Sequence, residues 1–167
     1  MQKIIFLDID GVICSIRSAV ACGGYPWRVK AEDMELFDLI AIKLVQKICK
    51  DCDAKIVLSS VWRIYHDFNM IGKELNLPII DKTPYKLTSH RGEEIAMWLR
   101  DNKVDKYVII DDDSDMLEEQ LPYFVKVDRN NGLSYENYEK IKELIKEDLH
   151  DNRVEKDIRQ EPQQKKD

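Results

Sequence analysis

The sequence has little that would let the protein bind nucleic acid broadly or cross a membrane. Its 26 lysines and arginines are outnumbered by 32 aspartates and glutamates, which gives a net charge of −6 and no broad basic surface for a duplex. No apolar run approaches the length of a transmembrane helix, and the apolar start is too short and too acidic for a signal peptide. We therefore expect a cytoplasmic protein without a membrane partner, in which a few local cations or a metal hold any anionic substrate.

Cysteine is also scarce. Cys14, Cys22, Cys49 and Cys52 are an even set, but a chain expected in a reducing compartment does not use them as a disulfide framework. Cys49 and Cys52 have the spacing of a redox pair, yet they fall at the end of an expected helix, where the helix dipole does not lower a thiol pKa. A zinc site that adds Cys14 and Cys22 is the alternative, with loose spacing. We expect buried or inert thiols.

Three short apolar runs define the expected sheet: residues 3–10 (KIIFLDID), 54–60 (AKIVLSS) and 106–112 (KYVIIDD). Each run is rich in β-branched residues and lacks polar–apolar alternation, which is typical of parallel strands covered on both faces. A shorter strand is expected within residues 123–128. The 167 residues suffice for one domain with a real core, which we assign to residues 1–150.

Helices are expected between these strands, over residues 35–50 and 91–102, and after them from about residue 134. Their apolar residues recur at helical spacing. The expected apolar faces comprise Leu36, Ile40, Leu44 and Ile48 in the first helix, Ile95, Trp98 and Leu99 in the second, and Tyr138, Ile141, Ile145 and Leu149 in the third. Alternating strands and helices predict an α/β fold, a three-layer Rossmann-like parallel sheet with helices on both faces.

Two segments fall outside this alternation. Residues 14–33 contain a Gly-Gly pair, a proline and aromatic residues, and they exceed the few residues that normally join a strand to a helix. We expect them to form a small flap over a binding site. Residues 151–167 are charged and lose the apolar period, which predicts a C-terminal tail or a helix extension.

The expected strands end in side chains that carry oxygen. These are Asp8 and Asp10 in the first, Ser59 and Ser60 in the second, and Asp111, Asp112, Asp113 and Asp115 in the third. Because ligands gather outside the carboxyl ends of parallel strands, these residues mark the expected site. Repulsion among at least four carboxylates there must be relieved by protonation or by a cation. Hard oxygen ligands at this density suit Mg²⁺, with a substrate phosphate completing its shell.

These motifs, in this order, resemble those of the haloacid dehalogenase-like (HAD) phosphatases. FLDIDGV at residues 6–12 is similar to the first motif of that superfamily, KIVLSS at 55–60 to the second, and YVIIDDDSD at 107–115 to the acidic fourth. The likeness covers about residues 1–149. Together with RGEEIAMWL and VDRNNGLS, it narrows to the HAD domain of Swiss Army Knife RNA repair proteins and its free-standing relatives. The resemblance implies a HAD-like fold and phosphatase chemistry.

The resemblance also implies a role for each acid. Asp8 would be the nucleophile that forms an aspartyl-phosphate, and Asp10 the general acid and then the general base. Mg²⁺ would be held by the Asp8 carboxylate, the Asp10 backbone carbonyl and Asp112, with Asp111 close by and able to exchange roles with Asp112. Gly11 would let the backbone turn away, so that both acids converge on one phosphate.

The substrate phosphate would be bound by a hydroxyl group and a cation. Ser59 would supply the hydroxyl, with Ser60 as the alternative. The third motif of the superfamily is usually a lysine. Here Arg91 opens the expected helix and is preferred, and Lys86 in the preceding loop is the alternative. Arg63 would reach the substrate or pair with the acidic cluster.

The flap offers candidate substrate contacts. Tyr25, Trp27 and Arg28 would stack on a base and contact phosphate, or their rings would pin the loop. Packing or surface roles are expected for Trp62, His66, His90, Asp113 and Asp115.

The sequence thus predicts a Mg²⁺-dependent phosphomonoesterase. Its small flap leaves the cleft open, which suits the terminal phosphate of a nucleotide or of a single-stranded nucleic acid. The alternatives are a phosphatase of small metabolites such as sugar phosphates, a phosphotransferase, and a catalytically idle binding module on the same fold. The presence of both Asp8 and Asp10 argues against the idle module.

Overall fold

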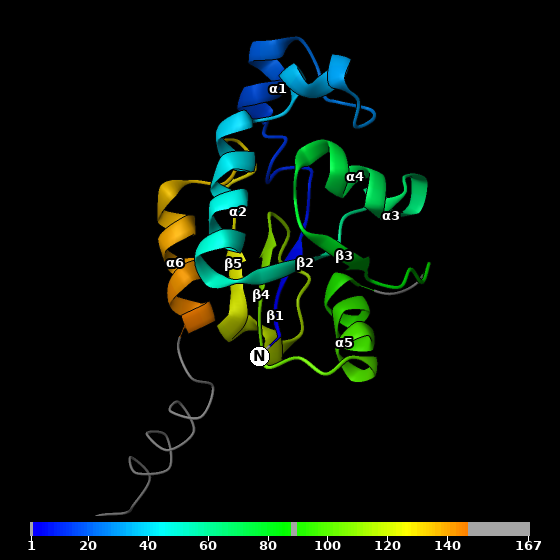
Figure 1. Ribbon diagram of the computed structural model, residues 1–167, viewed down its shortest axis with the longest axis vertical. Coiled ribbons are helices and arrows are strands. Elements are labelled where there is room, and N and C mark those ends of the chain that lie inside the picture. Colours follow the sequence, from blue (N-terminus) through cyan, green and yellow to red (C-terminus); the bar gives the residue numbers. More distant parts are fainter. Residues whose placement is uncertain (1, 88–89, 147–167) are drawn as a thin grey trace, which may run out of the picture.

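The computed structural model describes residues 2–87 and 90–146, which form a five-stranded parallel sheet in the order β3-β2-β1-β4-β5 (Figure 1). The strands are β1 (Lys3–Leu7), β2 (Ala54–Leu58), β3 (Ile79–Lys82), β4 (Lys106–Asp111) and β5 (Phe124–Lys126). The α-helices are α1 (Ile16–Cys22), α2 (Leu39–Cys52), α3 (Trp62–Tyr65), α4 (Phe68–Leu75), α5 (Arg91–Asp101) and α6 (Tyr135–Lys146). Two 3₁₀ helices, η1 (Ala31–Leu36) and η2 (Glu118–Tyr123), complete the elements. The predicted α/β fold is confirmed.

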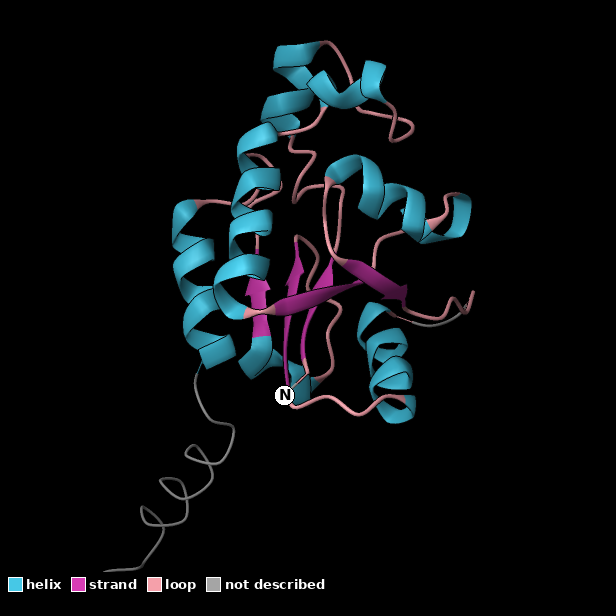
Figure 2. Cartoon of the chain, in the orientation of Figure 1, coloured by secondary structure: helices cyan, strands magenta, loops and turns pink. Residues whose placement is uncertain are grey.

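The central strand β1 explains the layers. Successive side chains of a strand point to opposite faces. Ile5 and Leu7 accordingly belong to the larger core, with residues of α2, α4 and α6, whereas Ile4 and Phe6 belong to the smaller core, with residues of α5. All four are fully buried. Helices therefore cover both faces of the sheet, as Figure 2 shows, and the absence of polar–apolar alternation in the sequence has this cause.

The helix expected over residues 35–50 starts later, at Leu39. The Asp38 carboxylate accepts hydrogen bonds from the backbone N–H groups of Ile40 and Ala41, both at 3.1 Å, and this cap fixes the first turn. The residues before it form η1, so Leu36 lies outside the helix. Ile40 is 70% exposed, and its expected place in the core was wrong. Ile48 is buried as predicted, and Leu44 is partly buried against the core. The other buried residues of the helix are Ala41, Ile42, Val45, Cys49 and Cys52.

Helices α5 and α6 follow the prediction closely. Ile95 and Trp98 are buried, and Leu99 packs against them. In α6, Tyr138, Ile141 and Ile145 are buried as predicted. Leu149 and the predicted tail, residues 151–167, lie outside the described residues. No helix in the described part of the chain is long and apolar enough to cross a membrane.

The flap is more regular than predicted. Its helix α1 begins after Ser15, whose hydroxyl accepts from the Ser18 N–H at 3.1 Å, and ends at Gly23 in the left-handed region (φ 84°). The two ends of the flap meet where the Asp38 N–H donates to the Ile13 carbonyl at 2.9 Å. In Figure 1, α1 and the segment after it lie beyond the carboxyl ends of the strands.

All four cysteines are free thiols. Cys14, Cys49 and Cys52 are buried, and burial raises the pKa of each thiol, which fits the predicted inert role. Cys22 is the exception, because it is exposed on the flap. Among the described residues, no cysteine belongs to a group that could hold a metal, so the zinc alternative finds no support there.

The register of the sheet brings the strand ends to one level. Leu7 of β1 pairs with Leu58 of β2 and with Ile110 of β4. The residues that follow, Asp8, Ser59 and Asp111 among them, therefore lie next to one another at the carboxyl edge.

Candidate active site

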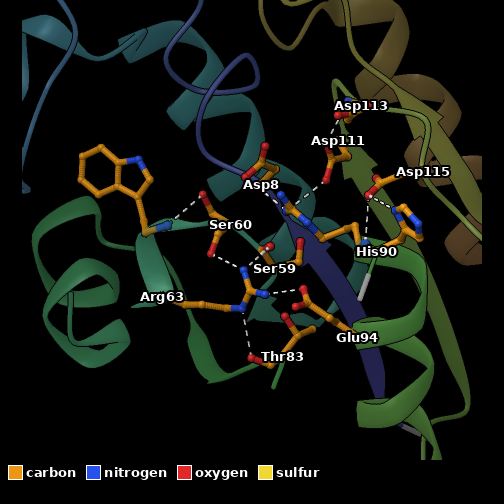
Figure 3. A network of polar contacts seen from close by, with 12 residues as sticks. Asp8, Ser59, Ser60, Arg63, Thr83, His90, Glu94, Asp111, Asp113 and Asp115 are labelled. Atoms are coloured by element: carbon orange, nitrogen blue, oxygen red, sulfur yellow. Dashed lines mark hydrogen bonds and ion pairs between the residues drawn. The ribbon is translucent and has the colours of Figure 1, made fainter. Parts of the chain in front are cut away.

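Three carboxylates form the centre of the site. One oxygen from each of Asp8, Asp111 and Asp112 lies within 4.8 Å of the other two. Asp8 is 5% exposed and Asp111 is fully buried. In Figure 3, Asp8 and Asp111 lie on one side of a polar network, and Arg63, Glu94 and Thr83 lie on the other.

Gly11 makes this gathering possible. Its φ is +77°, a conformation that other residues rarely adopt. A Cβ atom at this position would also lie only 2.4 Å from Cγ of Asp112. The loop after Asp10 can therefore reach the Asp112 carboxylate only if this residue has no side chain.

Arg91 brings positive charge to the cluster. Its Nη1 lies 3.4 Å from Oδ1 of Asp8 and 3.1 Å from Oδ2 of Asp111. The Asp115 carboxylate fixes the start of α5 by accepting from the Arg91 N–H at 2.9 Å, which matches the structural role expected of Asp115. Lys86, the alternative cation, is exposed in the loop before α5, so Arg91 is the residue that the structure places beside Asp8.

Two further candidates, Asp113 after β4 and His90 before α5, lie at the surface. Asp113 is exposed, and its carboxylate accepts from the Ser114 N–H at 2.7 Å. The His90 side chain is 75% exposed, with its Nδ1 4.0 Å from Oδ2 of Asp115. Both positions agree with the structural or surface roles expected from the sequence.

The cluster has unusual proton affinities. Burial, together with the charge of Asp8, raises the pKa of Asp111 to about 7, although Arg91 opposes the shift. Burial and Asp8 also raise the pKa of Asp112. Oδ2 of Asp111 is buried and forms no hydrogen bond to any described residue. Crowded carboxylates, one with a buried oxygen that has an ion pair to Arg91 but no hydrogen bond, fit a hard divalent cation, so the residues present are suited to Mg²⁺.

Asp10 lies beside the cluster and has a different partner. The Trp62 Nε1–H donates to Oδ2 of Asp10 at 3.0 Å. Trp62 was expected only to pack; it does pack against Phe37, with ring centroids 5.8 Å apart, but it also positions this carboxylate. Loss of water around the carboxylate, followed by the charge of Asp8, raises the pKa of Asp10. A carboxyl group that keeps its proton more readily is suited to act as a general acid.

The two serines differ in their bonding. Both are fully buried at the end of β2. The Ser60 hydroxyl accepts from the Trp62 N–H at 3.4 Å, whereas the Ser59 hydroxyl has no hydrogen-bond partner among the described residues. Ser59 therefore has the hydroxyl group that is free to bind another oxygen.

Arg63 supports the scaffold: its ion-pair partner is Glu94 and not a carboxylate of the acidic cluster. It is 3% exposed and forms an ion pair with the buried Glu94 of α5. Its guanidinium also donates to the carbonyls of Ser59 (2.9 Å), Ser60 (2.7 Å) and Thr83 (3.1 Å). The side chain thus ties the ends of β2 and β3 to α5. The sequence could not reveal this pairing, because Glu94 lies 31 positions away and meets Arg63 only in the folded structure.

A groove of about 820 Å³ adjoins Asp10. Tyr25 and Trp27 of the flap line it, and Trp27 is 87% exposed. Arg28 instead pairs with Asp33 at 3.0 Å and is not among the lining residues. Tyr65 and His66, at the end of α3, also line the groove. Neither of them was predicted from the sequence to be a site residue.

Arg129 is a further site residue that sequence reasoning missed. It lines the groove, and its Nε donates to Oδ2 of Asp112 at 2.9 Å. The turn motif VDRNNGLS was recognised, but nothing in the sequence alone indicates that its arginine turns toward the acidic cluster.

A parallel sheet whose strands β1 and β4 end in acids places the chain among α/β proteins with a carboxylate centre that could hold a metal ion. Within this class, the model of the family "HAD domain in Swiss Army Knife RNA repair proteins" matches residues 4–138. The chain belongs to this family. Comparison with curated proteins and with solved structures gave no significant match.

The buried Arg63–Glu94 pair generates a prediction about stability. Arg63→Met removes the guanidinium that pairs with the buried Glu94 carboxylate, so we expect the free energy of unfolding to fall by about 3–5 kcal/mol. Urea denaturation measures this change. The control is Arg100→Met on α5, the helix that carries Glu94. The Arg100 pair with Asp101 is exposed, so its loss should cost about 0.5 kcal/mol or less. An Arg63→Met protein of normal stability would contradict the structural role.

The raised pKa of Asp111 predicts how stability depends on pH. An unfolded chain protonates aspartate near pH 4, whereas the folded protein already protonates Asp111 at about pH 7. The folded state binds more protons between these values, so its stability falls as the pH rises through this window. In chelator, we expect a melting temperature about 2–4 °C lower at pH 8 than at pH 6.

Millimolar Mg²⁺ should raise the melting temperature at pH 8, because the folded cluster binds the ion and the unfolded chain does not. Asp111→Asn should flatten the pH dependence in chelator, whereas the exposed control Asp113→Asn should keep it. A melting temperature that rises from pH 6 to pH 8 in chelator would refute the assignment.

Proposed function

We propose that the protein is a Mg²⁺-dependent phosphomonoesterase that acts through an aspartyl-phosphate intermediate. The observation that carries the proposal is the placement of Asp8 next to Arg91 and to the carboxylates of Asp111 and Asp112, with Asp10 nearby. A nucleophile, a cation and a protonatable acid thus meet at one point. This combination is what transfer of a phosphoryl group to a carboxylate requires.

In the proposed reaction, a carboxylate oxygen of Asp8 attacks phosphorus, and the bond from phosphorus to the ester oxygen breaks. Asp10 gives its proton to the leaving oxygen, and its raised pKa supports this role. Asp10 then takes a proton from water, which hydrolyses the aspartyl-phosphate and restores Asp8. Trp62 keeps the Asp10 carboxylate in place throughout.

The other residues bind the phosphoryl group. Arg91 offsets its negative charge, and the free hydroxyl of Ser59 offers a hydrogen bond to one of its oxygens. Asp8, Asp111 and Asp112 would hold Mg²⁺, together with the Asp10 backbone carbonyl. When bound, the ion supplies charge that lowers the repulsion between a carboxylate nucleophile and a phosphate.

We further propose that the substrate is a nucleotide or the phosphorylated end of a single-stranded nucleic acid. The support is the groove beside Asp10, in which Tyr25, Trp27 and Tyr65 present exposed aromatic rings. Aromatic side chains of this kind stack on nucleobases without regard to sequence. A sugar phosphate has no aromatic ring to stack on these side chains, so the choice of substrate separates the two functions.

Replacement of the nucleophile tests the proposed chemistry. Asp8→Asn should lower Mg²⁺-dependent phosphate release by roughly a thousandfold or more, because the carboxylate that attacks phosphorus is lost. The assay is a panel of nucleotides, 3′- and 5′-phosphorylated oligonucleotides and sugar phosphates, with Mg²⁺ or chelator. Asp113→Asn, an exposed neighbour of the cluster, is the matched control and should keep its activity. Absence of turnover on the entire panel would favour the idle binding module.

Replacement of the flap tryptophan tests the substrate class. Stacking of a base on an aromatic ring is worth about 1–3 kcal/mol, so Trp27→Ala should raise the KM for a nucleotide or oligonucleotide roughly tenfold to a hundredfold. Hydrolysis of a sugar phosphate, which has no aromatic ring, should change little. Tyr85→Ala removes an exposed ring outside the groove and serves as the control. Equal losses on both substrates would show that the flap only shapes the site.

A further inference from the structure

The loop that carries Arg129 is firmly attached to both walls of the site. The backbone carbonyl of Arg129 accepts a hydrogen bond from the Ile16 N–H of the flap helix at 3.0 Å. A few residues further on, the Leu133 N–H donates to the Val12 carbonyl at 2.9 Å, next to Gly11. The backbone of Arg129 is thereby held in a fixed position between the flap and the catalytic loop.

The side chain of Arg129 is held far less firmly than its backbone. It is 69% exposed, and its Nε–Asp112 contact is the one hydrogen bond that it forms to a described residue. The Asp112 side chain is only 6% exposed, whereas the Arg129 guanidinium faces solvent and uses Nε alone for this pair. Its two Nη groups can therefore bind a ligand while Nε stays on Asp112. Arg91 differs, because its side chain is 14% exposed and is enclosed by two carboxylates.

Arg129 is also the only lysine or arginine among the described residues that line the groove. The other lining residues are mostly aromatic or aliphatic, apart from Asp10 and His66. An anionic group that enters the groove beside the scissile phosphate therefore meets one permanent positive charge. A guanidinium matches the geometry of a phosphate with two parallel hydrogen bonds.

We propose that Arg129 binds a second phosphate group of the substrate, so that the site selects nucleosides that carry two phosphates. One phosphate lies at Asp8, the base lies against the aromatic rings of the groove, and the other phosphate lies at Arg129. This inference rests on the proposed function and narrows its substrate class. Nucleoside bisphosphates and the ends of single strands share this chemistry.

Calorimetric titration of Asp8→Asn protein with Mg²⁺ tests the inference without turnover. The ligands are adenosine 5′-monophosphate, adenosine 3′,5′-bisphosphate and a 5′-phosphorylated adenosine dinucleotide. We expect at least one of the two-phosphate ligands to bind about tenfold more tightly than the monophosphate. Arg129→Gln in this background should remove that difference. The control Arg17→Gln, a flap arginine that pairs with Asp38 outside the groove, should preserve it.

Equal affinities for all three ligands would overturn the inference, and so would a difference that survives Arg129→Gln or vanishes equally in Arg17→Gln. A preference for the dinucleotide alone identifies a strand end as the source, and a preference for the bisphosphate alone identifies a free nucleotide. The proposed function is scored separately, by Mg²⁺-dependent phosphate release in the wild type. Turnover without the binding difference would refute only the role of Arg129. The binding difference without turnover would refute only the proposed phosphatase activity.

Discussion

Repulsion among carboxylates is the constraint on which the rest of the site depends. Parallel strands deliver Asp8 and the acids after β4 to the same edge, where burial strengthens their repulsion. Neighbouring residues reduce this repulsion or allow the carboxylates to come together in spite of it. Arg91 and Arg129 supply charge, and Gly11 lets the loop approach Asp112 without a clash. The remaining excess of negative charge is what makes the site receptive to a divalent cation and, through it, to a phosphate.

Three arginines around this centre show how exposure divides one chemical group among three tasks. Arg63, at 3% exposure, is fully committed to carbonyls and to Glu94 and only supports the scaffold. The side chain of Arg91, at 14% exposure, is fixed beside the reacting carboxylate. That of Arg129, at 69% exposure, is held by a single contact and remains able to respond to what enters the groove. The burial and the number of contacts of each side chain, and not the residue type, distinguish an arginine that supports the fold from one that is available to bind a ligand.

Much of the fold was predictable because its signals are local. The apolar runs of β1, β2 and β4 and the apolar faces of α5 and α6 are written in neighbouring residues. Strand β3 was missed because it has four residues and is only half buried, and so it lacks the signature of a central strand. The same holds for α3, a single turn.

The residues of the site also differ in whether local sequence predicts them. The acids of the centre were predicted, since each follows directly from the end of an apolar run. The partners of the acids were not, because Trp62 reaches Asp10 across 52 positions of sequence, and Arg129 reaches Asp112 from a different loop. Such contacts depend on the packing of helices against the sheet, which no local pattern records.

The closed stem of the flap has a consequence for how a protein of this kind can diversify. Because Ile13 and Asp38 are hydrogen-bonded to one another, the chain leaves the catalytic loop and returns to it at nearly the same point. The entropy of closing a loop grows only slowly with its length, so segments of other lengths would be accommodated on the same stem at little thermodynamic expense. The flap can therefore be replaced by a segment of different length or sequence, which would change the substrate specificity and leave the catalytic residues in place.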